Sequence, residues 1–116
     1  MTPRDVRAFL LDVIERTEEV RSFMATKSRA DFMRERLLQS AVERQLSIIG
    51  EAVVRTIALR PEFEVRIRSC RRIIGLRNRL VHAYMAIEPA NLYDIVDSCL
   101  EPLDQDVRRL LREVGE

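Results

Sequence analysis

The chain is poor in the residues that mark β-rich, disordered or disulfide-stabilised proteins. It has no tryptophan, its aromatic content is 5%, and it holds only 3 glycines, 4 prolines and 2 cysteines in 116 residues. Few turn-forming residues disfavour a β-rich fold, and an apolar content of 47% disfavours disorder. A chain of this length is expected to fold as one unit. The sequence therefore predicts a single all-α domain over residues 1–116.

Cysteine and apolar patterns also limit where the protein works and what it binds. Cys70 and Cys99 lie in apolar helical patterns without C-x-x-C spacing, which predicts buried free thiols in a reducing compartment. No cluster of histidine, cysteine or carboxylates has metal-site spacing, so we expect no metal and no other cofactor. The segment Met1–Asp5 lacks the apolar core of a signal peptide, and no apolar run approaches transmembrane length. We therefore expect a cytoplasmic protein that makes no membrane contact.

Apolar residues recur every three or four positions along most of the chain, which is the pattern of helices with one buried face. A Ser28–Asp31 start signal and a short turn at Ala30–Met33 precede the second long helix. Pro61 ends that helix, and Pro102 is expected to kink the last one. The first predicted helix runs from Thr2–Pro3 to about Met24, and the second long helix ends at about Ala58. The third spans roughly Arg68 to Val81, and the fourth begins at Glu88–Pro89. This order predicts an up-and-down bundle of four to five helices.

Positive charge is concentrated in one segment, although the net charge of the chain is only +1. No acidic residue falls between Glu64 and Glu88. Two interpretations stay open: an anion-binding surface, or a solvated helix face whose counter-charges come from other helices. The residues of this basic block are Arg66, Arg68, Arg71, Arg72, Arg77, Arg79 and His82.

The block contains the string R-N-R-L-V-H-A-Y at residues 77–84, which holds groups able to move a proton beside a phosphate. RNA can be cut without metal if a base takes the 2′-hydroxyl proton, a cation stabilises the phosphorane, and an acid protonates the leaving oxygen. Histidine is the residue type that can both accept and donate a proton, which His82 supplies here, and Arg77 offers a fork that matches phosphate. Asn78 lies four residues before His82, so it can orient the imidazole or bind a phosphate oxygen.

Helix geometry places a condition on this pair. Arg77 and His82 are five residues apart, which separates them by about 140° around a helix axis. They converge poorly unless the helix ends near His82 or a second subunit supplies the partner group. The competing interpretation is that a histidine near a helix C-terminus only caps carbonyl groups.

The string resembles the R-x4-H-x-Y signature of HepT, a ribonuclease toxin of the HEPN class. The similarity continues upstream, because Ala41–Leu46 and Ile48–Ala52 match the Ala-Val-x-Arg-x-Leu and I-I-G-E-A strings of that family. It covers roughly Ala41–Leu110. One departure is the absence of the tryptophan common in the family between the proline and the motif; Phe63 and Ile67 stand nearby instead.

The resemblance implies an HEPN-type homodimer with its active cleft between two protomers, acting as a metal-independent endoribonuclease on RNA. It implies that Arg77 and His82 are the catalytic pair and that Asn78 is the polar residue that follows the family's arginine. It also implies that Tyr84 accepts AMP from an MntA-like nucleotidyltransferase antitoxin. A tyrosine at this position that only packs its ring is the alternative.

Besides Asn78, three further residues are expected to support the site. Arg79 lies within the motif, and Arg44 and Glu51 fall seven apart on one helix face, where a structural salt bridge is the alternative. Gly50 either permits close helix approach or is a tolerated surface glycine.

Two other functions remain open at this point. One is a non-catalytic HEPN subunit that binds RNA or substrate for a two-component nucleotidyltransferase, and the other is a purely structural helical dimer. RNA cleavage in the presence of a chelator separates all three.

Overall fold

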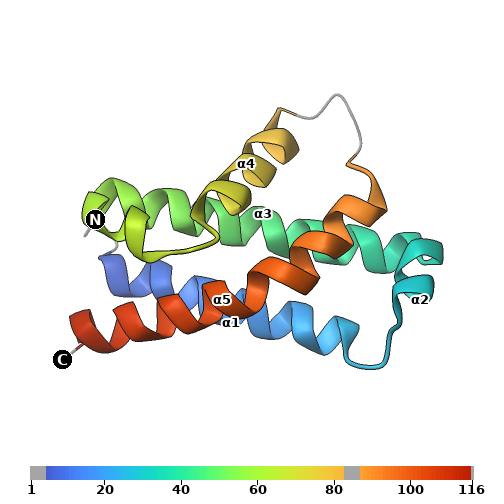
Figure 1. The fold of residues 1–116 in the computed structure, drawn as a ribbon, viewed down its shortest axis with the longest axis horizontal. Helices are drawn as coiled ribbons and strands as arrows, with labels where there is room; N and C mark the ends of the chain where they lie inside the picture. Colours follow the sequence, from blue (N-terminus) through green and yellow to red (C-terminus); the bar gives the residue numbers. More distant parts are fainter. Residues whose placement is uncertain (1–4, 83–86, 116) are drawn as a thin grey trace.

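The computed structural model describes residues 5–82 and 87–115, and all regular structure in these ranges is helical (Figure 1). This confirms the predicted all-α class. The elements are α1 (Val6–Met24), α2 (Arg29–Arg34), α3 (Arg36–Leu59), the 3-10 helix η1 (Pro61–Arg66), α4 (Cys70–Val81) and α5 (Pro89–Gly115). No helix in the described ranges is long and apolar enough to span a membrane.

Local signals account for most helix ends. Ser28 and Asp31 form a capping box, in which the Ser28 hydroxyl accepts from the Asp31 amide at 3.0 Å and the Asp31 carboxylate accepts from the Ser28 amide at 2.9 Å. Pro61 follows the end of α3, as predicted. The predicted third helix begins two residues late, at Cys70, because Ile67 and Ser69 have non-helical backbone.

The start of α1 differs from the prediction. Asp5 has extended backbone and caps the helix by accepting the Ala8 amide on its side chain at 3.2 Å, so α1 begins at Val6. Thr2 and Pro3 lie outside the described residues. Asp5 offers the same capping chemistry as Thr2 three residues farther along the chain.

The core lies where α1, α3 and α5 meet. α1 packs along both α3 and α5, and α4 stands at an angle on α3 with only a small contact to α5 (Figure 1). Figure 1 also shows α5 changing direction along its length, and Pro102 lies within this helix. Fully buried side chains from all three helices fill the centre: Leu10, Val13, Val20, Val42, Leu46, Ile49, Leu103 and Val107.

One face of α4 therefore packs against the rest of the protein, and the remainder of its surface is exposed or half-buried. Its buried residues are Cys70, Ile73 and Leu76, while Asn78 and Val81 are exposed. Cys70 and Cys99 are both buried free thiols, as predicted, and burial raises the pKa of the Cys70 thiol.

Candidate active site

The basic block divides into paired and unpaired arginines. Three members pair with carboxylates of other helices: Arg66 with Glu113, Arg68 with Asp106, and Arg77 with Glu51. Within residues 5–82 and 87–115 no carboxylate pairs with the other three, Arg71, Arg72 and Arg79, and Arg72 donates only to the Ser98 hydroxyl, at 3.0 Å. Counter-charges from other helices thus account for Arg66, Arg68 and Arg77, and anion binding by the other three arginines stays a prediction. The unpaired charge lies on α4.

The buried carboxylate of Asp106 explains why the first part of the block is neutralised. Asp106 is 2% exposed, and it accepts from the Arg68 backbone amide at 2.9 Å and from Arg68 Nε at 3.1 Å. Burial acts to raise the pKa of Asp106, but the Arg68 hydrogen bonds outweigh it and hold that pKa below its usual value. Arg68 therefore joins α5 to the start of α4, and the carboxylate of Asp106 offsets its charge.

Arg77 lies where α4 crosses α3, and Gly50 makes that crossing possible. A Cβ atom at Gly50 would lie 2.3 Å from the Cβ of Arg77, far inside van der Waals contact. Gly50 is buried. Of the two interpretations of this glycine, close helix approach is therefore correct.

The Arg77 guanidinium is held from two sides. Its Nε and Nη2 donate to Glu51 Oε2 at 3.1 and 2.7 Å, and its Nη1 donates to Asn78 Oδ1 at 3.0 Å. An arginine has five N–H donors, so three such bonds leave two for an anion. The Arg77 side chain is 24% exposed. It is thus oriented but remains accessible.

Glu51 is positioned to keep that orientation at neutral pH. The Arg77 hydrogen bond, followed by one from Arg55 Nε at 2.9 Å, holds the pKa of Glu51 below its ordinary value. Glu51 is therefore ionised whenever the pH is above that lowered pKa. Sequence spacing suggested Arg44 as its partner, but no ion pair joins these two described residues, and Glu51 pairs with Arg77 and Arg55 instead.

His82 occupies the position directly after α4. Its backbone amide donates to the Asn78 carbonyl at 3.1 Å, its backbone leaves helical geometry (φ −99°, ψ 17°), and the residue is exposed. α4 thus ends immediately before His82, as the spacing of the pair calls for, but His82 does not line the hollow that Arg77 lines, and their convergence stays a prediction. The backbone amide makes this cap, so the imidazole is not needed for it. Tyr84 lies outside the described residues.

A hollow of about 350 Å³ adjoins the Arg77–Glu51 pair, between α1, α3 and α4. Arg44 lines it together with Arg77 and Glu51, so three of the predicted site residues share this hollow. Phe9 and Asp12 of α1 line it as well. The sequence analysis missed both α1 residues, because no motif marks them and only packing places α1 here.

Arg79 lies elsewhere. It lines a separate hollow of about 370 Å³ with Arg72, between α4 and the first turns of α5. The structure therefore groups Arg44, Glu51 and Arg77 around the hollow between α1, α3 and α4, with Asn78 bonded to Arg77, and separates Arg79 from them.

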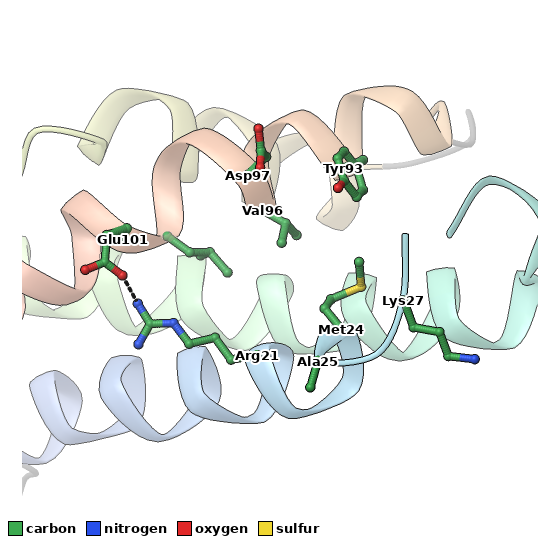
Figure 2. Close-up of a pocket in the computed structure, with 9 residues that line it drawn as sticks. Arg21, Met24, Ala25, Lys27, Tyr93, Val96, Asp97 and Glu101 are labelled. Atoms are coloured by element: carbon green, nitrogen blue, oxygen red, sulfur yellow. Dashed lines mark hydrogen bonds and ion pairs between the residues drawn. The ribbon is translucent and has the colours of Figure 1, made fainter. Parts of the chain in front are cut away.

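A third hollow, of about 300 Å³, lies between the end of α1 and α5 (Figure 2). Figure 2 shows Arg21 reaching across it to Glu101, while Lys27 extends away and donates to Glu35 at 2.9 Å. Both cations are thus paired, and none of the predicted site residues lines this hollow. We assign it no part in the chemistry.

Comparisons with known proteins agree with the motif. The model of the family described as "Ribonuclease HepT-like" matches residues 13–110. Two similar proteins come from Methanocaldococcus jannaschii. "Putative RNase MJ1380" is 32% identical over 116 residues, covering 98% of this chain and 97% of the relative. "Putative RNase MJ0127" is 28% identical, covering 98% and 93%. No solved structure matches the chain.

Proposed function

Because the chain belongs to the HepT-like ribonuclease family, we propose that it is a metal-independent endoribonuclease, the toxin of a HepT/MntA-type toxin–antitoxin system. The observation that carries this proposal is that hydrogen bonds to Glu51 and Asn78 fix the orientation of the Arg77 guanidinium. A guanidinium held by Glu51 and Asn78, with free donors, lies five residues before an exposed histidine at the end of α4. An oriented cation together with an imidazole that can accept and donate a proton is what phosphodiester cleavage needs.

The proposed reaction uses the RNA's own 2′-hydroxyl as nucleophile. His82 takes its proton, the 2′-oxygen attacks phosphorus, and Arg77 donates to the phosphorane oxygens. The bond from phosphorus to the 5′-oxygen then breaks, and that oxygen receives a proton from an imidazolium. The products are a 2′,3′-cyclic phosphate and a 5′-hydroxyl.

A homodimer supplies the second acid–base group in this scheme. One copy of His82 acts as base and the other as acid, with the two copies of α4 facing each other across the cleft. The uncovered state of α4 supports this, because Asn78, Val81 and His82 are all exposed in the single chain. The exposed apolar side chain of Val81, 54% accessible, is then available to pack at the interface.

A non-catalytic RNA-binding subunit is the second candidate. The unpaired arginines of α4 favour it, because they attract RNA whether or not the strand is cut. It differs from the first candidate in one measurable respect, which is turnover.

The first prediction concerns metal and product ends. Purified protein should cleave single-stranded RNA in excess EDTA, because the proposed chemistry uses only Arg77 and His82. Fragments should carry 2′,3′-cyclic phosphate or its hydrolysis product at one end and 5′-hydroxyl at the other, as read by end-labelling and mass spectrometry. Strict Mg²⁺ dependence with 5′-phosphate ends would exclude the mechanism, and binding without cleavage would favour the second candidate.

The second prediction concerns control by an MntA-like nucleotidyltransferase. We propose that Tyr84 accepts AMP, which places an anion near Arg77 and His82 where it competes with substrate phosphate. Tyr84→Phe keeps the ring and deletes the nucleophilic oxygen, so it should stay toxic and gain no mass when incubated with the partner and ATP. Wild-type protein should gain one or more AMP units and lose activity. AMP appearing on the Phe variant would place the modification at another residue.

A further inference from the structure

The hollow that contains Arg79 combines two arginines with apolar side chains and has no assigned role. Arg72 and Arg79 stand on its rim, and Leu76 and Ile95, both buried, form its floor. Neither arginine has a carboxylate partner in the described part of the chain. The one carboxylate that lines the hollow, Asp94, is paired with Arg29 at 3.2 Å. Neither arginine of this hollow is therefore held by a carboxylate within residues 5–82 and 87–115.

Gly75, between the two arginines, is the second and independent observation. It is half-buried in the middle of α4, where glycine destabilises a helix relative to alanine. Within residues 5–82 and 87–115, a Cβ atom built there meets nothing within 4 Å, and no glycine in these ranges has positive φ. The fold of the single chain thus gives no reason for this glycine, in contrast to Gly50. Close approach of a ligand to the backbone of α4 would be a reason for a glycine at this position.

We propose that this α4–α5 groove, formed by Arg72, Gly75, Leu76, Arg79 and Ile95, binds the stretch of single-stranded RNA next to the cleaved phosphate. The inference rests on the proposed function. Arg72 and Arg79 contact phosphates, a nucleobase packs on Leu76 and Ile95, and Gly75 lets the sugar–phosphate backbone approach α4.

Helix geometry fits a strand rather than one isolated anion. Arg72 and Arg79 are seven residues apart, which places them on the same face of α4 about 10.5 Å apart along its axis. That separation suits two phosphates of one strand. Arg79 and His82 are three residues apart and are neighbours on the surface, so a strand leaving Arg79 continues toward His82.

A second copy of the chain is the other possible occupant, and charge disfavours it. Two α4 helices packed directly at Gly75 would bring two copies of Arg72 and Arg79 together, with like charges in contact. An RNA strand neutralises the same residues. In the proposed dimer the groove therefore lines the cleft and does not form its packed interface.

The test measures binding of an RNA that the enzyme cannot cut. A fluorescein-labelled 2′-O-methyl RNA of 12 nucleotides has no 2′-hydroxyl, so anisotropy at several salt concentrations reports affinity alone. The Arg72→Gln/Arg79→Gln variant should bind roughly tenfold more weakly, and the slope of log K against log salt should fall by about 1.4 for two lost phosphate contacts. Arg112→Gln, which removes an exposed arginine on the last turn of α5, is the control and should leave both values near wild type.

Gly75→Ala tests the close approach without changing charge. It should melt at or above the wild-type temperature, because the space is open, and it should bind the same RNA several-fold more weakly. Wild-type affinity and salt slope in the arginine variant would overturn the proposal. So would a Gly75→Ala protein that binds RNA normally but becomes monomeric, because Gly75 would then belong to a subunit interface.

These outcomes separate failure of the groove from failure of the proposed function. If wild-type protein cuts RNA while the groove variants bind the probe normally, the function stands and the groove assignment falls. If wild-type protein neither binds the probe nor cuts RNA, both fall.

Discussion

His82→Ala is expected to slow RNA cleavage by about 10²- to 10⁴-fold, the usual worth of a general acid or base. The side chain is exposed and follows the last residue of α4, so its removal leaves no cavity in the core. Melting temperature and dimerisation should therefore match wild type. The measurements are the cleavage rate of a labelled RNA under single-turnover conditions and host growth after induction. Full toxicity of a well-expressed His82→Ala protein would overturn the catalytic assignment.

Arg77→Ala provides the complementary case, because it removes charge stabilisation and leaves His82 in place. It should also abolish cleavage and toxicity while helicity and dimerisation persist. Glu51 then loses one of its two arginine partners but keeps Arg55, and it is 41% exposed, so water replaces the lost bonds. The pH dependence of the rate distinguishes the two variants: it should change when the proposed acid–base group His82 is removed and should persist when Arg77 is removed.

Gly50→Ala is expected to lower the cleavage rate by about 100-fold, because the new methyl group pushes α4 and Arg77 away from α3. The added Cβ would lie 2.3 Å from the Arg77 Cβ, and that atom is fixed to the helix backbone, so the helices must separate. A misplacement of about 1 Å at a reacting group can cost about 100-fold in rate. Overpacking typically costs about 1–3 kcal/mol, offset by about 1 kcal/mol from the better helix propensity of alanine. A lower melting temperature should therefore accompany the slower rate.

Gly75→Ala is the matched control for stability, since it makes the same chemical change on a neighbouring helix in open space. It should not lower the melting temperature. If Gly50→Ala fails to fold, Glu51→Gln tests the positioning of Arg77 with little change in side-chain volume. It removes the negative charge that holds Arg77, so it should lower kcat with little effect on the melting temperature. Wild-type rate and stability in Gly50→Ala would show that the α3–α4 contact does not place Arg77.

The helices could be predicted because their signals are local. Periodic apolar residues, the Ser28–Asp31 capping box and Pro61 act within one or two turns, and α2, α3, α4 and α5 appear within two residues of where the predictions end or start them. The predicted start of α1 was wrong, and the reason is equally local. Two capping residues compete there, and Asp5 is the one used.

The candidate site was predictable only as a string of residues. The motif placed Arg77, Asn78 and His82 together, and the break of α4 at His82 agrees with the geometry that they require. Glu51 was expected to support the site, but its partner was not predictable. Glu51 and Arg77 are 26 residues apart, and no periodicity along one helix relates them.

The amino-acid sequence alone was enough to establish an all-α chain, its helix order and the motif of its family, because short-range propensity, capping and periodicity encode these features. Only the tertiary structure decided which arginines of the basic block pair with carboxylates and which do not. Arg66 and Arg68 pair with carboxylates of α5, and Arg77 pairs with a carboxylate of α3. Arg72 and Arg79 have no carboxylate partner in the described ranges. The same applies to two glycines on neighbouring helices, Gly50 pressed against Arg77 and Gly75 facing open space. Contacts between segments far apart in the chain depend on how helix faces pack, and no local pattern contains that information.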